Sequence, residues 1–167
     1  MSSHLACRKD VAKLSLVAER KSLSPTKTIS GCRPRAIRVL IAEDEDASRE
    51  FLAVELERAG FLVCQTANGE ECLEQVAGFA PDVIILDLML PRVSGFAVAR
   101  AVRALERRRN VPILAVTALA SEALRIEALA AGCDGFLRKP VPAAVVVEHV
   151  HLLLDRPAWK LPSDGQP

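Results

Sequence analysis

The amino-acid sequence predicts an α/β fold: a doubly wound, five-stranded parallel sheet with helices on both faces, forming a three-layer sandwich. From residue 36 onward, short aliphatic runs alternate five times with longer segments of helical periodicity. One run, residues 83–86 (VIIL), is apolar throughout, as expected of a central strand covered on both faces. Half of the 167 residues are hydrophobic, which is enough to bury a sizeable core.

The first two strand–helix units are marked by apolar runs and helix-end signals. Residues 38–42 (RVLIA) form the first strand, and an acidic stretch that includes Ser48 begins a helix that Gly60 ends. Residues 61–66 form the second strand. Residues 70–77 form a short helix with apolar positions on one face.

The remaining units follow the same pattern. Strands are expected at residues 83–86, 111–116 and 135–137. Helices are expected at residues 96–107, 122–131 and 142–154. Ser121 and Gly132 flank the middle helix, in the positions of a serine N-cap and a glycine that ends a helix.

Charge and composition divide the chain into three parts. Residues 1–36 hold eight basic and two acidic side chains, a net of +6, and are expected to form a disordered, basic N-terminal extension. Residues 37–155 are expected to form the folded domain. Residues 156–167 are expected to form a Pro-rich C-terminal tail.

Several classes of protein are excluded by composition. No apolar run reaches the roughly 18 residues that span a bilayer, and the N-terminus lacks a secretory signal, so a cytoplasmic protein is expected. Five scattered cysteines and three histidines indicate neither a disulfide framework nor a zinc site.

Polar residues follow four of the five predicted strands. Glu43 and Asp44 follow the first strand, Asp87 the third, Thr117 the fourth and Lys139 the fifth. Each alone could be an exposed acid, a helix cap or a solvated lysine. Because ligands of open α/β folds bind beyond the carboxyl ends of the strands, these five residues are expected to form one site.

The residue types of this site predict phosphoryl transfer. Three carboxylates in a crevice repel one another unless a cation lies between them, and oxygen ligands alone favour Mg²⁺. Lys139 and Thr117 offer a positive charge and a hydroxyl donor to a phosphoryl group. Asp87 is the expected nucleophile.

Four motifs in order, VLIAEDEDASR, PDVIILDLMLPRVSGF, VPILAVTALA and AGCDGFLRKP, resemble the response-regulator receiver family over about residues 37–155. The resemblance implies a flavodoxin-like (βα)5 fold. It also implies reversible phosphorylation of Asp87 by a histidine kinase or histidine phosphotransfer protein, with Mg²⁺ as cofactor. The expected product is a single-domain phospho-switch that controls a downstream effector protein.

The resemblance also assigns roles to single residues. Asp44 and Asp87 would bind Mg²⁺ through carboxylates, Met89 through its backbone carbonyl, and Glu43 through water. Thr117 and Lys139 would hold the phosphoryl group.

Further implied roles concern access to the site and its switch. The small side chain of Ala118 would leave access to the phosphoryl group, and the Lys139–Pro140 peptide would be cis. Thr117 and Phe136 would move when the switch changes state, with core packing as the alternative reading of Phe136. Met89 and Leu119 would make self-dephosphorylation slow.

Other functions were weighed against this one. An enzyme of the haloacid-dehalogenase type would need a second acid where Met89 stands, so the chain is expected to catalyse only its own phosphorylation and dephosphorylation. A phosphate-independent interaction domain stays open as an alternative. No DNA-binding domain and no membrane span are expected, and a phosphorylation-dependent dimer is left open.

Overall fold

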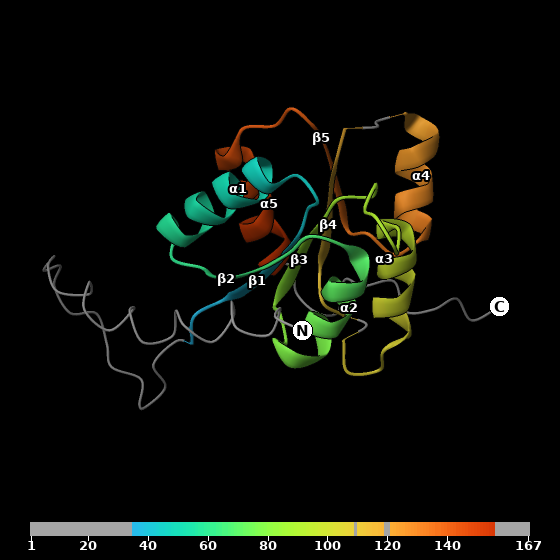
Figure 1. Cartoon of the computed structure of the whole chain (residues 1–167), viewed down its shortest axis with the longest axis horizontal. Coiled ribbons are helices and arrows are strands. Elements are labelled where there is room, and N and C mark those ends of the chain that lie inside the picture. The colour runs from blue at the N-terminus through green and yellow to red at the C-terminus, as the bar shows by residue number, and fades with distance from the viewer. Residues whose placement is uncertain (1–34, 109, 119–120, 156–167) are drawn as a thin grey trace, which may run out of the picture. The chain divides into compact units, whose positions relative to one another are not determined.

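The computed structural model describes residues 35–108, 110–118 and 121–155, and it confirms the predicted α/β sandwich (Figure 1). The strands are β1 (Arg38–Ala42), β2 (Leu62–Thr66), β3 (Val83–Leu86), β4 (Ile113–Thr117) and β5 (Gly135–Arg138). The helices are α1 (Asp46–Arg58), α2 (Gly69–Gly78), α3 (Gly95–Ala104), α4 (Glu122–Ala130) and α5 (Ala143–Leu154). Strands and helices therefore alternate throughout, as the sequence predicts.

The five strands form one parallel sheet in the order β2-β1-β3-β4-β5. The chain first builds outward from β1 to β2, then returns to place β3 on the other side of β1. This reversal lies between β1 and β3, and open α/β sheets bind ligands at such a point. The topology therefore directs attention to the residues that follow these two strands.

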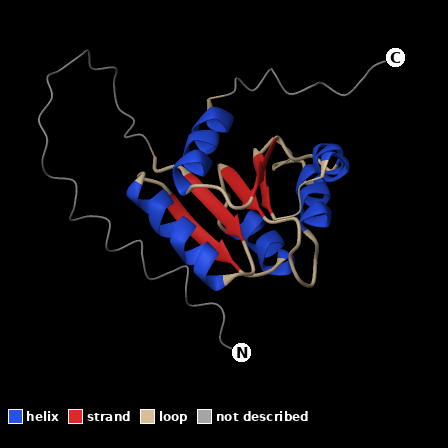
Figure 2. Cartoon of the chain, turned by 90° about the horizontal axis from the view of Figure 1, so that it is seen from above, coloured by secondary structure: helices blue, strands red, loops and turns tan. Residues whose placement is uncertain are grey.

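Helices cover both faces of the sheet (Figure 2). Successive side chains of a strand pack in opposite cores, one on each face. In β1, Val39 and Ile41 pack in the core formed with α1 and α5. Leu40 and Ala42 pack in the core formed with α2, α3 and α4. All four residues of β3 are buried, which confirms the prediction that the VIIL run is a central strand.

Two glycines end α1 and α4 in the same way. Gly60 and Gly132 have φ of +94° and +105°, a region that L-residues with side chains rarely adopt. After α1, the amide of Gly60 donates to the carbonyl of Glu57 and the amide of Phe61 donates to that of Leu56. This is the Schellman pattern, and it satisfies carbonyls that the helix leaves open.

The structure differs from the sequence prediction around β4. Helix α3 ends at Ala104 rather than at residue 107, and β4 begins at Ile113 rather than at residue 111. The amide of Val111 donates to the carbonyl of Arg108 within a turn, and Pro112 has no amide hydrogen. Neither residue therefore has a backbone amide available to donate the first hydrogen bond from β4 to a neighbouring strand.

The predicted N-terminal extension and C-terminal tail lie outside the described residues, apart from residues 35 and 36, and stay predictions. Among the described residues, no helix combines the length and apolar character needed to cross a membrane.

Candidate functional site

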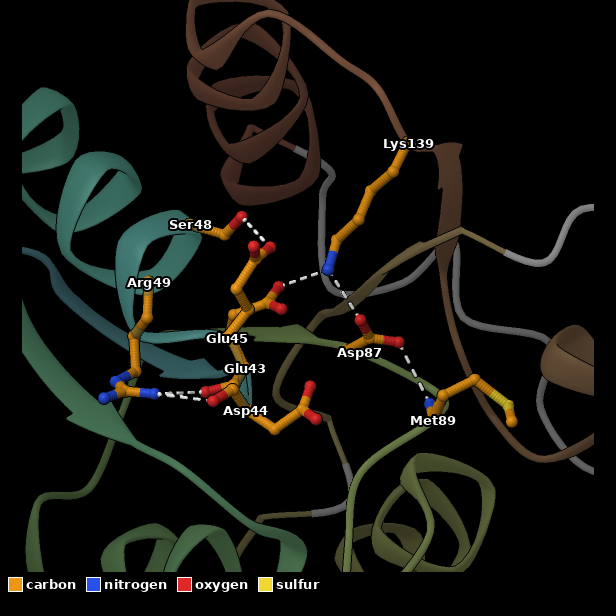
Figure 3. A network of polar contacts seen from close by, with 8 residues as sticks. All are labelled: Glu43, Asp44, Glu45, Ser48, Arg49, Asp87, Met89 and Lys139. Carbon is orange, nitrogen blue, oxygen red and sulfur yellow. Dashed lines mark hydrogen bonds and ion pairs between the residues drawn. The ribbon is translucent and has the colours of Figure 1, made fainter.

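Glu43 and Asp44 after β1, Asp87 after β3 and Lys139 after β5 lie together at the carboxyl edge of the sheet (Figure 3). Thr117, the last residue of β4, belongs to the same edge. Backbone hydrogen bonds extend the ladder past the strand ends: the amide of Asp87 donates to the carbonyl of Ala42 at 2.9 Å. The amide of Lys139 donates to the carbonyl of Thr117, also at 2.9 Å. The sheet thus sets the spacing of the functional side chains, because each lies at or directly after the end of a paired strand.

Asp87 lies at the centre of the site. Its carboxylate is buried, with 7% of the side chain exposed. Lys139 Nζ donates to Asp87 Oδ2 at 2.6 Å, and the amide of Met89 donates to Asp87 Oδ1 at 3.0 Å. The two oxygens of this carboxylate are therefore held in one orientation.

Lys139 also pairs with Glu43, so one ammonium group connects two buried carboxylates. The pKa of Glu43 is raised, mainly by burial and in part by the negative charge of Asp87. The hydrogen bond and the positive charge of Lys139 lower this pKa but do not cancel the effect of burial. Burial would lower the pKa of Lys139, but the hydrogen bonds and charges of Asp87 and Glu43 outweigh it and raise that pKa. Lys139 is therefore charged at neutral pH.

The three acids of the site could hold a metal ion. One carboxylate oxygen from each of Glu43, Asp44 and Asp87 lies within 4.8 Å of the others. Glu43 and Asp87 are buried, whereas Asp44 is exposed. A cluster of oxygen donors open to solvent on one side fits a hard divalent cation that keeps some of its water.

Thr117 brings an unused hydrogen-bond donor to the same edge. Its side chain is fully buried, and its hydroxyl has no hydrogen-bond partner among the residues that the structure describes. Such groups are rare in proteins, and an unpaired one calls for an explanation. A phosphoryl oxygen would satisfy this hydroxyl.

The remaining predicted residues occupy varied positions. The side chain of Met89 is 55% exposed, and the Lys139–Pro140 peptide is cis. Phe136 is half-buried and packs against the core shared with α2, α3 and α4. Leu119 lies outside the described residues.

Arg49 is part of the site and was missed by sequence reasoning. Its Nη1 donates to the carbonyl of Glu43 at 2.7 Å, and the same atom lies 3.4 Å from the carbonyl of Asp44 (Figure 3). Its Nη2 pairs with Asp46. An arginine in the first turn of the helix after the acidic pair was the available signal, since it can reach back to the residues before the helix.

Gly95 precedes the helix predicted at residues 96–107, yet in the structure it is the first residue of α3 and packs against the backbone of Asp87. Its amide donates to the carbonyl of Leu88 at 3.0 Å. A Cβ at this position would lie 2.2 Å from the carbonyl oxygen of Asp87. Only glycine therefore lets α3 begin this close to the backbone of Asp87.

Known proteins match this chain through the same region. The response regulator receiver domain family matches residues 39–151. The DNA-binding dual master transcriptional regulator RpaA of Synechocystis is 36% identical over 119 residues, which cover 71% of this chain and 49% of RpaA. The phosphate regulon transcriptional regulatory protein PhoB of Pseudomonas aeruginosa is 34% identical over 118 residues, which cover 71% of this chain and 52% of PhoB.

Solved structures show the same fold. Chemotaxis response regulator CheY4 of Vibrio cholerae has a TM-score of 0.68 and 29% identity, covering 71% of this chain and 99% of CheY4. The receiver domain of a sensor histidine kinase from Pseudomonas aeruginosa has a TM-score of 0.68 and 28% identity, covering 73% of this chain and 100% of that domain. The latter was solved with a magnesium ion coordinated in its active-site cleft.

The prediction that DNA-binding proteins are excluded was wrong. RpaA is a DNA-binding regulator, and this chain spans about half the length of the curated relatives that it matches. The residues of the receiver region carry no information about a DNA-binding module elsewhere in a protein. The expectation of a single-domain protein stays a prediction.

Fold, site and comparisons agree on one family of signalling modules. The matched region contains every residue of the polar site and all five strands apart from Arg38, the first residue of β1. The chain belongs to the response regulator receiver domain family of two-component systems.

Proposed function

We propose that the chain accepts a phosphoryl group from a phosphohistidine onto Asp87. An Oδ oxygen of Asp87 attacks phosphorus, the bond from phosphorus to the imidazole nitrogen breaks, and the imidazole leaves with the electron pair. One observation carries the proposal: the buried carboxylate of Asp87 is fixed by Lys139 at 2.6 Å and by the amide of Met89 at 3.0 Å. A positioned nucleophile beside a fixed positive charge is what phosphoryl transfer requires.

Mg²⁺ fits the acidic cluster as the cofactor. Asp44 and Asp87 would hold it through carboxylates, Met89 through its backbone carbonyl, and Glu43 through water. When bound, Mg²⁺ supplies positive charge that offsets these acids and the phosphoryl oxygens. Arg49 orients the backbone of Glu43 by its hydrogen bond to the carbonyl, and so supports one side of the cluster.

Lys139 and Thr117 hold the phosphoryl group after transfer. Lys139 already contacts an oxygen of Asp87, and the buried hydroxyl of Thr117 has no partner within the described part of the chain, so it can donate to a phosphoryl oxygen. When Thr117 turns toward the phosphoryl group, space opens beside β4, and Phe136 of the adjacent β5 moves to fill it. Phosphorylation thereby selects between two conformations of the chain.

Hydrolysis of the phosphoryl group is expected to be slow. The exposed side chain of Met89 carries a thioether, which is a poor acceptor and does not orient a water molecule for attack. The chain therefore acts as a switch that stores a phosphoryl group, not as an enzyme that turns over an external substrate.

The test is incubation with acetyl phosphate and Mg²⁺, followed by intact mass spectrometry. The expected result is the addition of one phosphoryl group, absent without Mg²⁺ and absent in Asp87→Asn. Asp155→Asn is the matched control, since it makes the same change at an exposed residue after α5. An unmodified chain would favour the phosphate-independent interaction domain, and steady release of inorganic phosphate at many turnovers would favour an enzyme.

A further inference from the structure

Met89 is a large apolar side chain that the fold places at the surface, beside the proposed phosphorylation site. It is 55% exposed, whereas its neighbours Leu88 and Leu90 are buried. The amide of Met89 donates to Asp87 Oδ1 at 3.0 Å, so its backbone is tied to the carboxylate. The thioether extends outward from that hydrogen bond (Figure 3). In the reaction proposed above, this thioether is only an inert group.

Exposure makes Met89 the accessible sulfur of the described chain. Peroxides convert methionine thioethers to sulfoxides, and the only other methionine of the sequence is Met1. The thiols of Cys64, Cys72 and Cys133 are buried. Burial also raises the pKa of Cys72 and of Cys133 to about 12, so their reactive thiolates are scarce. Among the described residues, Met89 is therefore the sulfur-containing side chain most open to an oxidant.

We propose that Met89 is an oxidation site and that its sulfoxide shortens the lifetime of the phosphoryl group on Asp87. This inference rests on the proposed function. The oxidant is a peroxide: the sulfur lone pair attacks one peroxide oxygen, and the bond between the two oxygens breaks. The second oxygen takes the proton of the first and leaves as water. Sulfur is oxidised by two electrons, and hydrogen peroxide is reduced.

Oxidation reverses the hydrogen-bonding character of this side chain. A thioether is a weak acceptor, whereas a sulfoxide is polar and carries an acceptor oxygen. The side chain has three rotatable bonds, and more than half of its surface is free of packing, so its end can turn toward a group held on Asp87. There the sulfoxide oxygen accepts a hydrogen bond from a water molecule and orients it toward phosphorus.

The hydrolysis that follows returns the chain to its resting state. The oxygen of the water bonds to phosphorus, and the bond from phosphorus to the Oδ oxygen of Asp87 breaks. The carboxylate keeps the electron pair, and inorganic phosphate leaves with the proton of the water. Oxidation of Met89 thus converts a slow switch into a faster one.

The experiment measures the half-life of the phosphoryl group before and after oxidation of the full chain. Hydrogen peroxide is added and then removed with catalase, acetyl phosphate and Mg²⁺ load Asp87, and decay is followed by intact mass once the donor is removed. Peptide mapping is expected to show sulfoxide at residue 89 of the folded protein. The half-life is expected to fall about three- to tenfold, the contribution of one hydrogen bond to the attacking water.

Three variants separate Met89 from other groups that peroxide modifies. Met89→Leu removes the thioether, so peroxide is expected to leave the half-life at that variant's own untreated value. Leu152→Met, made together with Met89→Leu, supplies an equally exposed methionine, since Leu152 is 57% exposed, but in the last turn of α5. Peroxide is expected to oxidise it without changing the half-life. Met89→Gln carries an amide oxygen, and a shorter half-life than that of Met89→Leu is expected without any peroxide.

Three results would overturn the inference. They are no sulfoxide at residue 89 of the folded protein, an unchanged half-life of the oxidised chain, and equal shortening in treated Met89→Leu, because another group then carries the effect. Failure of acetyl phosphate to modify Asp87 in the untreated chain overturns the proposed function itself, and it is seen before any peroxide is added.

Discussion

Gly95 is the position where a single methyl group tests the link between fold and site. A Cβ added there would lie 2.2 Å from the carbonyl oxygen of Asp87 and 2.7 Å from Cα of Leu88. Real Cβ atoms essentially never come closer than 3.0 Å to another heavy atom, so α3 and the Asp87 backbone must separate by about 0.8 Å. Both partners are buried backbone, which cannot move aside as a flexible side chain can.

The expected cost of Gly95→Ala is about 1–3 kcal/mol in the free energy of unfolding, the usual cost of overpacking. A displacement of this size at the nucleophile also lowers the phosphorylation rate of the folded protein by about 10- to 100-fold. Gly78→Ala is the matched control, since a Cβ on this exposed last residue of α2 meets nothing within 4 Å. That change is expected to stabilise the protein by about 0.5 kcal/mol through helix propensity.

The assays are urea denaturation and the rate of phosphorylation by acetyl phosphate, corrected for the folded fraction. If Gly95→Ala matches Gly78→Ala in both stability and rate, then the close packing of α3 under Asp87 does not position the nucleophile. That result would refute the reasoning.

Three further predictions concern other parts of the described chain. Lys139→Met is expected to slow phosphorylation by about 100-fold or more, measured by intact mass, because a fixed charge beside the reacting oxygen is lost; an unchanged rate would contradict this. Arg103 donates to the backbone carbonyls of Gly132 and Val111 and pairs with Asp134 at 2.6 Å. Arg103→Met is therefore expected to lower the free energy of unfolding, measured by urea denaturation, by about 2–4 kcal/mol. The folded protein is expected to keep its phosphorylation rate. Burial raises the pKa of Cys72 and of Cys133 to about 12, so few of these thiols are ionised at about pH 8. Peptide mapping after iodoacetamide should show both unlabelled until denaturant is added, and labelling of the folded protein within minutes would contradict this.

The fold and the core of the site could be predicted from the sequence because both depend on local patterns. The apolar VIIL run marks a strand buried on both faces, and the parallel topology brings the residues after each strand to one edge. The helix-ending positions of Gly60 and Gly132 were predicted for a similar reason, since the positive φ that glycine tolerates is a local property.

What could not be predicted depends on contacts between distant segments. Arg49 acts through hydrogen bonds to backbone carbonyls, which no residue pattern specifies. The need for glycine at position 95 follows from how closely α3 approaches β3, which requires coordinates. A pocket of about 450 Å³ beside Asp87 is lined by residues from separate segments, among them Ser48, Ala118 and Ala143, and each of these alone looks like an ordinary small residue.

The central claim is that Asp87 is the residue that carries the phosphoryl group. The most direct measurement is treatment with acetyl phosphate and Mg²⁺, reduction with borohydride, which converts an aspartyl phosphate to homoserine, and peptide mapping by mass spectrometry. The predicted result is homoserine at position 87, dependent on Mg²⁺ and on the phosphodonor. Homoserine at another aspartate, or at none, would contradict the claim.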